Sequence, residues 1–178
     1  MNEIREIVTK AIVGKGKKLI RLKNSVTPDH EAFSILGCWV INHEFEASLN
    51  DKIVEIEGTL EVNVWYAYDN NTKTDVAKQV LRYNEKIRTK QIVKDVSDDT
   101  RDVIVRILQQ PTCTNASINN DLVEVEIVFE ILAEILGETK MTVTVFTNNN
   151  VLDNHNIIDD DFESEIDENF IDESKIVG

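Results

Sequence analysis

The chain has little of the residues that interrupt or cross-link a fold. Its 178 residues include only two prolines, six glycines and two cysteines. So little proline and glycine excludes a collagen-like chain and a proline-rich spacer. Cys38 and Cys113 lack the spacing of a metal site, which favours small buried thiols that stay reduced. A late cross-link in a durable assembly is the alternative.

Long hydrophobic runs are also missing. No stretch approaches the roughly 20 apolar residues that a membrane-spanning helix needs. The first residues, MNEIR, do not begin the apolar core of a signal peptide. We therefore expect synthesis in a cytoplasm and no membrane insertion.

Basic charge is scarce and unevenly placed. The formal net charge is −14, yet residues 1–23 carry seven bases against two acids, and residues 153–173 carry ten acids. This overall acidity argues against a nucleic-acid binder, which gains its affinity by neutralising phosphates. The opposite charges of the two ends would attract one another between copies.

A repeated strand pattern is what the chain does have. Residues 53–68 (IVEIEGTLEVNVWYAY) and 122–137 (LVEVEIVFEILAEILG) both alternate apolar and polar side chains, at an offset of 69. A period of two is typical of strands with one buried face and one solvent face. Similarity at a fixed offset indicates a duplicated unit, although two amphipathic strands could also match by chance. The sequence predicts an all-β fold of antiparallel, sandwich-like sheets in two related units.

The predicted organisation has four parts. They are a basic N-terminal segment (1–24), a first β unit (25–96), a second β unit packed on the first (97–150) and an acidic disordered tail (151–178). Residues 3–13 fit a helix and a strand equally well. We predict turns at Gly14 and Gly16, at residues 69–72 (DNNT) and at residues 137–138, and a strand break at residues 109–111.

No motif predicts catalysis or metal binding. The three histidines lack the partner spacing of a zinc site or a catalytic pair: His30, His43 and His155. Residues 14–17 (GKGK) lack the glycine spacing of a phosphate loop. The glutamates at 55, 57 and 61 share one strand face, and we interpret them as the solvated side of a sheet. A hydrolase would instead need them beside a deep pocket. We therefore predict no enzyme, no cofactor and no metal.

Aromatic residues cluster around the first long strand. We interpret Trp39, Trp65, Tyr66 and Tyr68 as core residues. Tryptophan and tyrosine also anchor interfaces, so a contact surface is the alternative. A carbohydrate-binding β-sandwich that uses Trp39, Trp65 and Tyr68 is the alternative function, and it requires those rings to be exposed and coplanar.

The acidic tail is also patterned. Ile158, Phe162, Ile166 and Phe170 recur every four residues among carboxylates and would form one stripe on a helix. A free segment of this charge is expected to be disordered. It could fold on binding a groove of a partner, or it could simply be a solvating tail.

Several segments resemble the outer spore coat morphogenetic protein CotE family of endospore-forming Firmicutes. They are residues 5–18 (REIVTKAIVGKGKK), 34–43 (SILGCWVINH), 54–58 (VEIEG), 63–68 (NVWYAY), 108–111 (LQQP) with Cys113, and 132–140 (LAEILGETK). They follow the family's order over nearly the whole chain. The tail departs from the family, because asparagine and isoleucine dilute its acids.

The resemblance implies a non-enzymatic scaffold of the spore coat. Such proteins are made in the mother-cell cytoplasm and form a homo-oligomer or lattice around the forespore. They rest on the basement layer that a coat ATPase, the coat basement-layer protein, lays down. They recruit outer coat proteins, so the final location is the outer coat layer.

The resemblance also assigns roles to two regions. Self-assembly belongs to the N-terminal region, here Arg5, Ile7, Val8, Lys10, Ile12, Lys15, Lys17 and Lys18. Partner binding belongs to the acidic end, here Asp159, Asp160, Asp161, Phe162, Glu163, Ile166 and Phe170.

Overall fold

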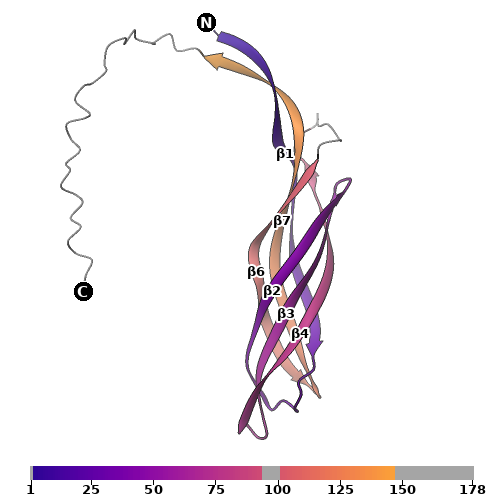
Figure 1. Ribbon diagram of the computed structural model, residues 1–178, viewed down its shortest axis with the longest axis vertical. Coiled ribbons are helices and arrows are strands. Elements are labelled where there is room, and N and C mark those ends of the chain that lie inside the picture. The colour runs from indigo at the N-terminus through magenta and orange to yellow at the C-terminus, as the bar shows by residue number, and fades with distance from the viewer. Residues whose placement is uncertain (1, 94–100, 147–178) are drawn as a thin grey trace, which may run out of the picture. The chain divides into compact units, whose positions relative to one another are not determined.

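The computed structural model describes residues 2–93 and 101–146, and within them it contains strands and no helix. The strands are β1 (Asn2–Val26), β2 (Ser34–Asn50), β3 (Ile53–Tyr68), β4 (Lys73–Arg88), β5 (Lys90–Gln91), β6 (Asp102–Asn119) and β7 (Leu122–Phe146). They form two sheets, of order β2-β3-β4 and β5-β1-β7-β6 (Figure 1). The predicted class, all-β with antiparallel sheets, is confirmed.

The chain divides into two units. One consists of residues 6–143, and the other of residues 1–5 with residues 144–178. Both sheets lie largely in the first unit, and the contacts below belong to it unless stated otherwise. None of the described residues forms a helix long and apolar enough to cross a membrane.

The duplicated pattern corresponds to two hairpins. β2 pairs with β3, and β6 pairs with β7, through two-residue turns at 51–52 and 120–121. Each turn begins with a residue at positive φ, Asp51 (55°) or Asn120 (53°), which are types that tolerate this region. The ladder pairs residues 46–50 with 53–57 in the first hairpin and 115–119 with 122–126 in the second. The same register at the same offset supports two related units.

The core lies between the two sheets. It is built by the alternation that the sequence showed, because β3 turns mainly its even-numbered residues inward and β7 its odd-numbered ones. The fully buried members come from both sheets: Val54, Ile56, Leu60, Val62 and Val64 in β3, and Val123, Ile127, Phe129, Ile131 and Ala133 in β7. A cluster shared by two facing sheets is the arrangement of a β-sandwich.

Two predicted turns are wrong, and both had been placed at glycine. β1 runs through Gly14 and Gly16 as one strand, which also decides the ambiguity over residues 3–13. A Cβ at Gly16 would lie 2.5 Å from the Arg88 carbonyl oxygen, so this glycine allows a close approach of β4. β7 likewise continues through Gly137. The alternation of buried and less buried residues runs without a break from Ile135 through Gly137 to Thr139.

Other local predictions had mixed outcomes. The hairpin turn at residues 69–72 is confirmed, with Asp69, Asn70 and Asn71 at φ of 51°, 55° and 64°. The break at residues 109–111 is wrong, because β6 passes through Pro111. The pairing of β6 with β7 is nevertheless irregular there. Pro111 is tolerated because β6 is an edge strand.

The predicted domain boundaries remain a prediction. The N-terminal segment is joined to the second hairpin, because β1 lies between β5 and β7 in the four-stranded sheet. The predicted disordered tail (151–178) lies outside the described residues.

Candidate assembly surfaces

The solvent face of the four-stranded sheet is crossed by ion pairs. Three bases of β1 each meet a glutamate of β7: Lys15 with Glu134 (3.0 Å), Lys17 with Glu130 (3.1 Å) and Arg21 with Glu126 (3.3 Å). From one ion pair to the next, the residue number on β7 decreases as the residue number on β1 increases, as in an antiparallel pair of strands. The bases near the start of the chain are therefore largely paired within the chain, and their partners here are glutamates of β7, the strand that contains the second copy of the repeated pattern.

Glu134 stands out in this row because its side chain is only 2% exposed. Lys15 from one neighbouring strand and Arg106 from the other cover its carboxylate. The hydrogen bond from Arg106 and then the adjacent Lys15 ammonium hold the pKa of Glu134 below its ordinary value, against the effect of burial. Removing either partner would leave a buried charge partly uncompensated, so the three side chains favour one alignment of β1, β7 and β6.

The remaining bases of the predicted assembly segment also have partners within the chain. Lys10 pairs with Asp102 (3.0 Å), and Lys18 crosses between the sheets to Glu85 (2.6 Å). Arg5 pairs with Glu3 (2.8 Å) within the other unit. The apolar members, by contrast, are exposed: Ile7, Val8 and Ile12. The segment therefore presents apolar side chains rather than unpaired charge.

A second surface is the solvent face of the three-stranded sheet. Five large apolar side chains there are between 42% and 60% exposed: Leu36, Trp39, Ile41, Trp65 and Val80. We call them the tryptophan face. Both indole rings approach Gly37, because a Cβ at this glycine would lie 3.9 Å from Trp39 and 4.0 Å from Trp65. An exposed apolar cluster of this kind is typical of an interaction site.

Charges of opposite sign flank the tryptophan face. β2 places Glu44 and Glu46 at solvent, and β4 places Lys78 and Arg82. Among the residues that the structure describes, none of these four charges has an ion-pair partner. The face is therefore apolar at its centre, acidic along one edge strand and basic along the other.

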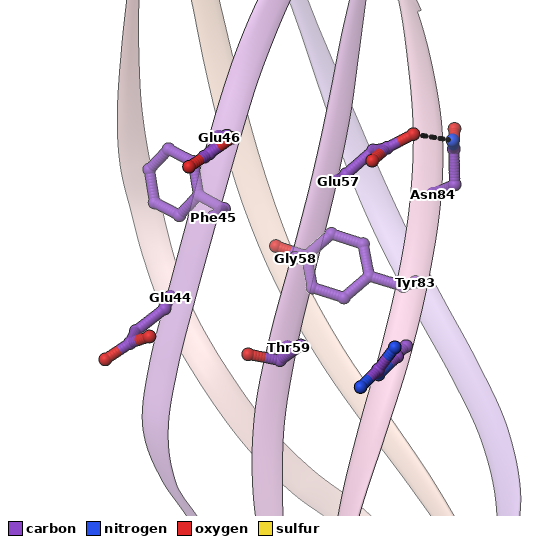
Figure 2. A pocket seen from close by; sticks show the side chains of 9 residues that line it. Glu44, Phe45, Glu46, Glu57, Gly58, Thr59, Tyr83 and Asn84 are labelled. Atoms are coloured by element: carbon purple, nitrogen blue, oxygen red, sulfur yellow. Dashed lines mark hydrogen bonds between the residues drawn. The ribbon is translucent and has the colours of Figure 1, made fainter.

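Next to the tryptophan face lies an open hollow around Gly58. Figure 2 shows Glu44, Glu46 and Glu57 around it, with the Tyr83 ring beside Gly58. A Cβ at Gly58 would lie 2.5 Å from Cζ of Tyr83, so the glycine leaves room for this ring. The Tyr83 ring therefore packs closely against Gly58, and the hollow is open to solvent.

Tyr83 belongs to an aromatic cluster that joins the two sheets. Its hydroxyl group lies 2.7 Å from Nε2 of His43, and the Phe129 ring of β7 meets both rings edge-on. His43 reaches this cluster because β2 bulges beside Asn42, whose φ is 53°. The extra residue of the bulge exchanges the inward-facing and outward-facing positions of β2 beyond it, so that His43 points inward. Sequence reasoning missed this role, because the bulge leaves no motif.

Protonation of His43 is expected to destabilise the fold. Burial lowers the pKa of His43 from its ordinary value of 6.5. As the pH falls through 6.5, the unfolded chain takes up a proton that the folded chain still refuses, so the free energy of unfolding decreases until the folded pKa is reached. Urea denaturation at about pH 7.5 and about pH 5 measures this loss. His43→Gln should reduce it, whereas His30→Gln, a half-exposed control, should not. Equal losses in all three proteins would contradict the assignment.

The predicted carboxylate row lies on an open face, and each member has a polar neighbour. Glu55 pairs with Lys86 (2.8 Å), Glu57 accepts a hydrogen bond from Asn84 (2.8 Å), and Glu61 accepts one from Asn63 (3.2 Å). Within the described residues, no three acidic, histidine or cysteine side chains are arranged to hold a metal ion. The arrangement therefore fits the interpretation of a solvated sheet face.

The predicted aromatic core divides between two faces. Tyr66 is fully buried, as predicted, and Tyr68 turns to the same side and stacks on the His30 ring at 4.2 Å. The core interpretation is wrong for Trp39 and Trp65, which are exposed on the opposite face. The three-ring platform of the carbohydrate hypothesis is therefore not formed. The alternation along β3 could have predicted the exposure of Trp65, because this residue lies between the buried Val64 and Tyr66.

The predicted partner-binding residues, Asp159 to Asp161, Phe162, Glu163, Ile166 and Phe170, lie outside the described residues. Their role stays a prediction.

Comparison with protein families matches residues 3–173 to the family described as outer spore coat protein E (CotE). The match covers nearly the whole chain, so the chain belongs to the CotE family. Comparison with curated proteins and with solved structures gave no match. Membership of this family implies an outer spore coat protein, and the family is a structural one that is not known for enzymatic activity.

Proposed function

We propose that the chain assembles with copies of itself into a scaffold layer around the forespore, after synthesis in the mother-cell cytoplasm. The observation that carries the proposal is the tryptophan face, with its apolar centre and the unpaired, opposite charges of its two edge strands. A surface of this composition is costly in a protein that stays single, and it is useful in one that associates.

The tryptophan face is complementary to itself. If two copies meet face to face about a two-fold axis that runs parallel to the strands, β2 of one copy lies over β4 of the other. Glu44 and Glu46 then meet Lys78 and Arg82 of the second copy, twice in the interface. The tryptophans come together at the centre, where aromatic anchors contribute most of the binding energy.

A two-fold contact alone stops at a dimer, so growth into a layer needs a second surface. The exposed apolar residues of β1, which are Ile7, Val8 and Ile12, supply it. In this proposal the N-terminal segment is still an assembly element, and its apolar side chains make the contact. Lys10, Lys15 and Lys17 then pair β1 with its own sheet, and Lys18 pairs it with the facing sheet.

We further propose that the acidic end binds the partners of this scaffold, namely outer coat proteins. The support is its composition, with ten acids and four regularly spaced apolar residues in residues 153–173. Such a segment suits a basic, partly apolar groove on a partner. Contact with the basement-layer protein of the coat is proposed on family grounds.

Removing residues 153–178 is expected to separate the two activities. The truncated chain should form particles as large as those of the full chain, because both proposed contact surfaces are retained. Its capture of coat proteins from sporulating cells should fall by about tenfold or more. Size-exclusion chromatography and a pull-down assay measure the two effects.

A full-length variant with Phe162, Ile166 and Phe170 replaced by serine is the matched control, because it keeps the acids and removes the apolar stripe. Capture that survives this variant would assign binding to charge alone. A truncated chain that no longer assembles would contradict the proposed division of roles.

A further inference from the structure

The two cysteines of the chain lie on facing edge strands. Cys38 is on β2, at the edge of the three-stranded sheet, and Cys113 is on β6, at the edge of the four-stranded sheet. These two strands contact one another across the sandwich. Both cysteines are partly buried and pack against the core. Their side chains therefore point into the space between the sheets from opposite sides.

The two thiols are also close enough for each to shift the pKa of the other. Cys113 lies at an irregular point of β6, because the register shifts on both sides of it. Its sulfur lies 3.3 Å from the Asn115 carbonyl oxygen. A bulged strand bends locally and re-aims its side chains, which brings this sulfur toward β2.

The two thiols are not equivalent. The neighbouring Cys38 thiol lowers the pKa of Cys113, whereas the neighbouring Cys113 thiol and burial raise the pKa of Cys38. The thiolate is the species that attacks a disulfide. Cys113 is therefore suited to react first and Cys38 to react second.

We propose that Cys38 and Cys113 form an intramolecular disulfide that joins the two sheets when a small-molecule disulfide oxidises the folded chain. The Cys113 thiolate attacks the small disulfide RSSR, forming a mixed disulfide and releasing one RS⁻. Cys38 then gives up its proton and its sulfur attacks the Cys113 sulfur, which releases the second RS⁻. Two protein thiols become one disulfide, RSSR is reduced, and the two protons leave on two RSH molecules.

This bond would bridge strands that are 75 positions apart in the chain. Closing so long a loop restricts the unfolded chain strongly, so the oxidised protein should melt about 10 °C higher than the reduced one. The bond also stays within one chain, because both sulfurs face the interior of the sandwich. In a reducing cytoplasm the pair remains as thiols, and it closes only when the surroundings become oxidising.

Oxidation of the full chain with glutathione disulfide tests the proposal. After free thiols are blocked with an alkylating agent and the protein is denatured, the monomer should carry no alkyl group and should have lost two hydrogen masses. Proteolysis should yield one peptide pair linked through Cys38 and Cys113, and a reductant should release it. The melting temperature of the oxidised protein reports the stabilisation.

Single substitutions test the order of attack. In Cys38→Ser, Cys113 should accumulate as a mixed disulfide with glutathione, because the resolving thiol is missing. In Cys113→Ser, glutathione disulfide should modify Cys38 at least about tenfold more slowly than it modifies Cys113 in Cys38→Ser. Two alkylated thiols after oxidation of the unsubstituted chain would overturn the proposal. So would a disulfide-linked dimer on a non-reducing gel, and neither of these outcomes depends on a variant that folds.

Discussion

Replacing Trp39 and Trp65 together by serine is expected to leave a folded chain that no longer assembles into a layer. Both indoles are more than two-fifths exposed, so their loss removes little from the core. Central aromatic residues of an interface each contribute about 2 kcal/mol or more, so the double variant should weaken association at least about 100-fold. Sedimentation velocity over a range of protein concentrations measures this change.

Two isoleucines of β6 provide matched controls for the tryptophan pair. Ile104 and Ile118 are 42% and 38% exposed but belong to the other sheet. A variant that carries serine at both should assemble like the unsubstituted chain. Normal assembly of the tryptophan variant would show that the tryptophan face is not the contact. Failure of the isoleucine variant would show that the loss of assembly is not specific to that face.

Exchanging the charges that flank the tryptophan face tests the same contact in a second way. Replacing Glu44 and Glu46 by lysine should weaken assembly, because each new lysine then faces a base of the second copy. Adding Lys78→Glu and Arg82→Glu to the same chain should restore it.

Replacing Phe129 by alanine is expected to have the largest effect on stability. The ring is fully buried and lies edge-on to His43 and Tyr83, at 5.3 and 5.2 Å, where the two sheets meet. Emptying such a site costs about 3–5 kcal/mol, which is a large part of the roughly 5–15 kcal/mol that stabilises a typical domain. Urea denaturation in the background of the tryptophan variant measures the loss without interference from assembly.

Phe33→Ala is the control for this substitution, because it removes the same ring from a side chain that is 57% exposed. Its cost should stay within about 1 kcal/mol. Similar costs for the two phenylalanines would mean that the sheets do not meet at Phe129.

The fold class followed from the sequence because alternation is a local signal. The buried set of β3, from Val54 to Val64, could be read by counting residues in steps of two. The turn at residues 69–72 was equally local. The glycines at 14, 16 and 137 misled the prediction, because a glycine also serves where two backbones approach. At Gly16 the approaching group is the Arg88 carbonyl, which sequence spacing does not show.

The candidate surfaces were harder to predict, because they depend on phase and on distant partners. The bulge beside Asn42 reverses β2, so counting along the strand gives the wrong face for its second half. The salt bridge of Lys15 with Glu134 joins residues more than a hundred positions apart. The N-terminal bases therefore looked available for assembly, although the folded chain already pairs them.

Electron microscopy of the purified full-length chain tests self-assembly most directly. We predict ordered arrays or large regular particles for the unsubstituted chain, and no arrays, only single molecules or small oligomers, for the variant with serine at positions 39 and 65. Single molecules of the unsubstituted chain, even at high protein concentration, would contradict the proposed scaffold.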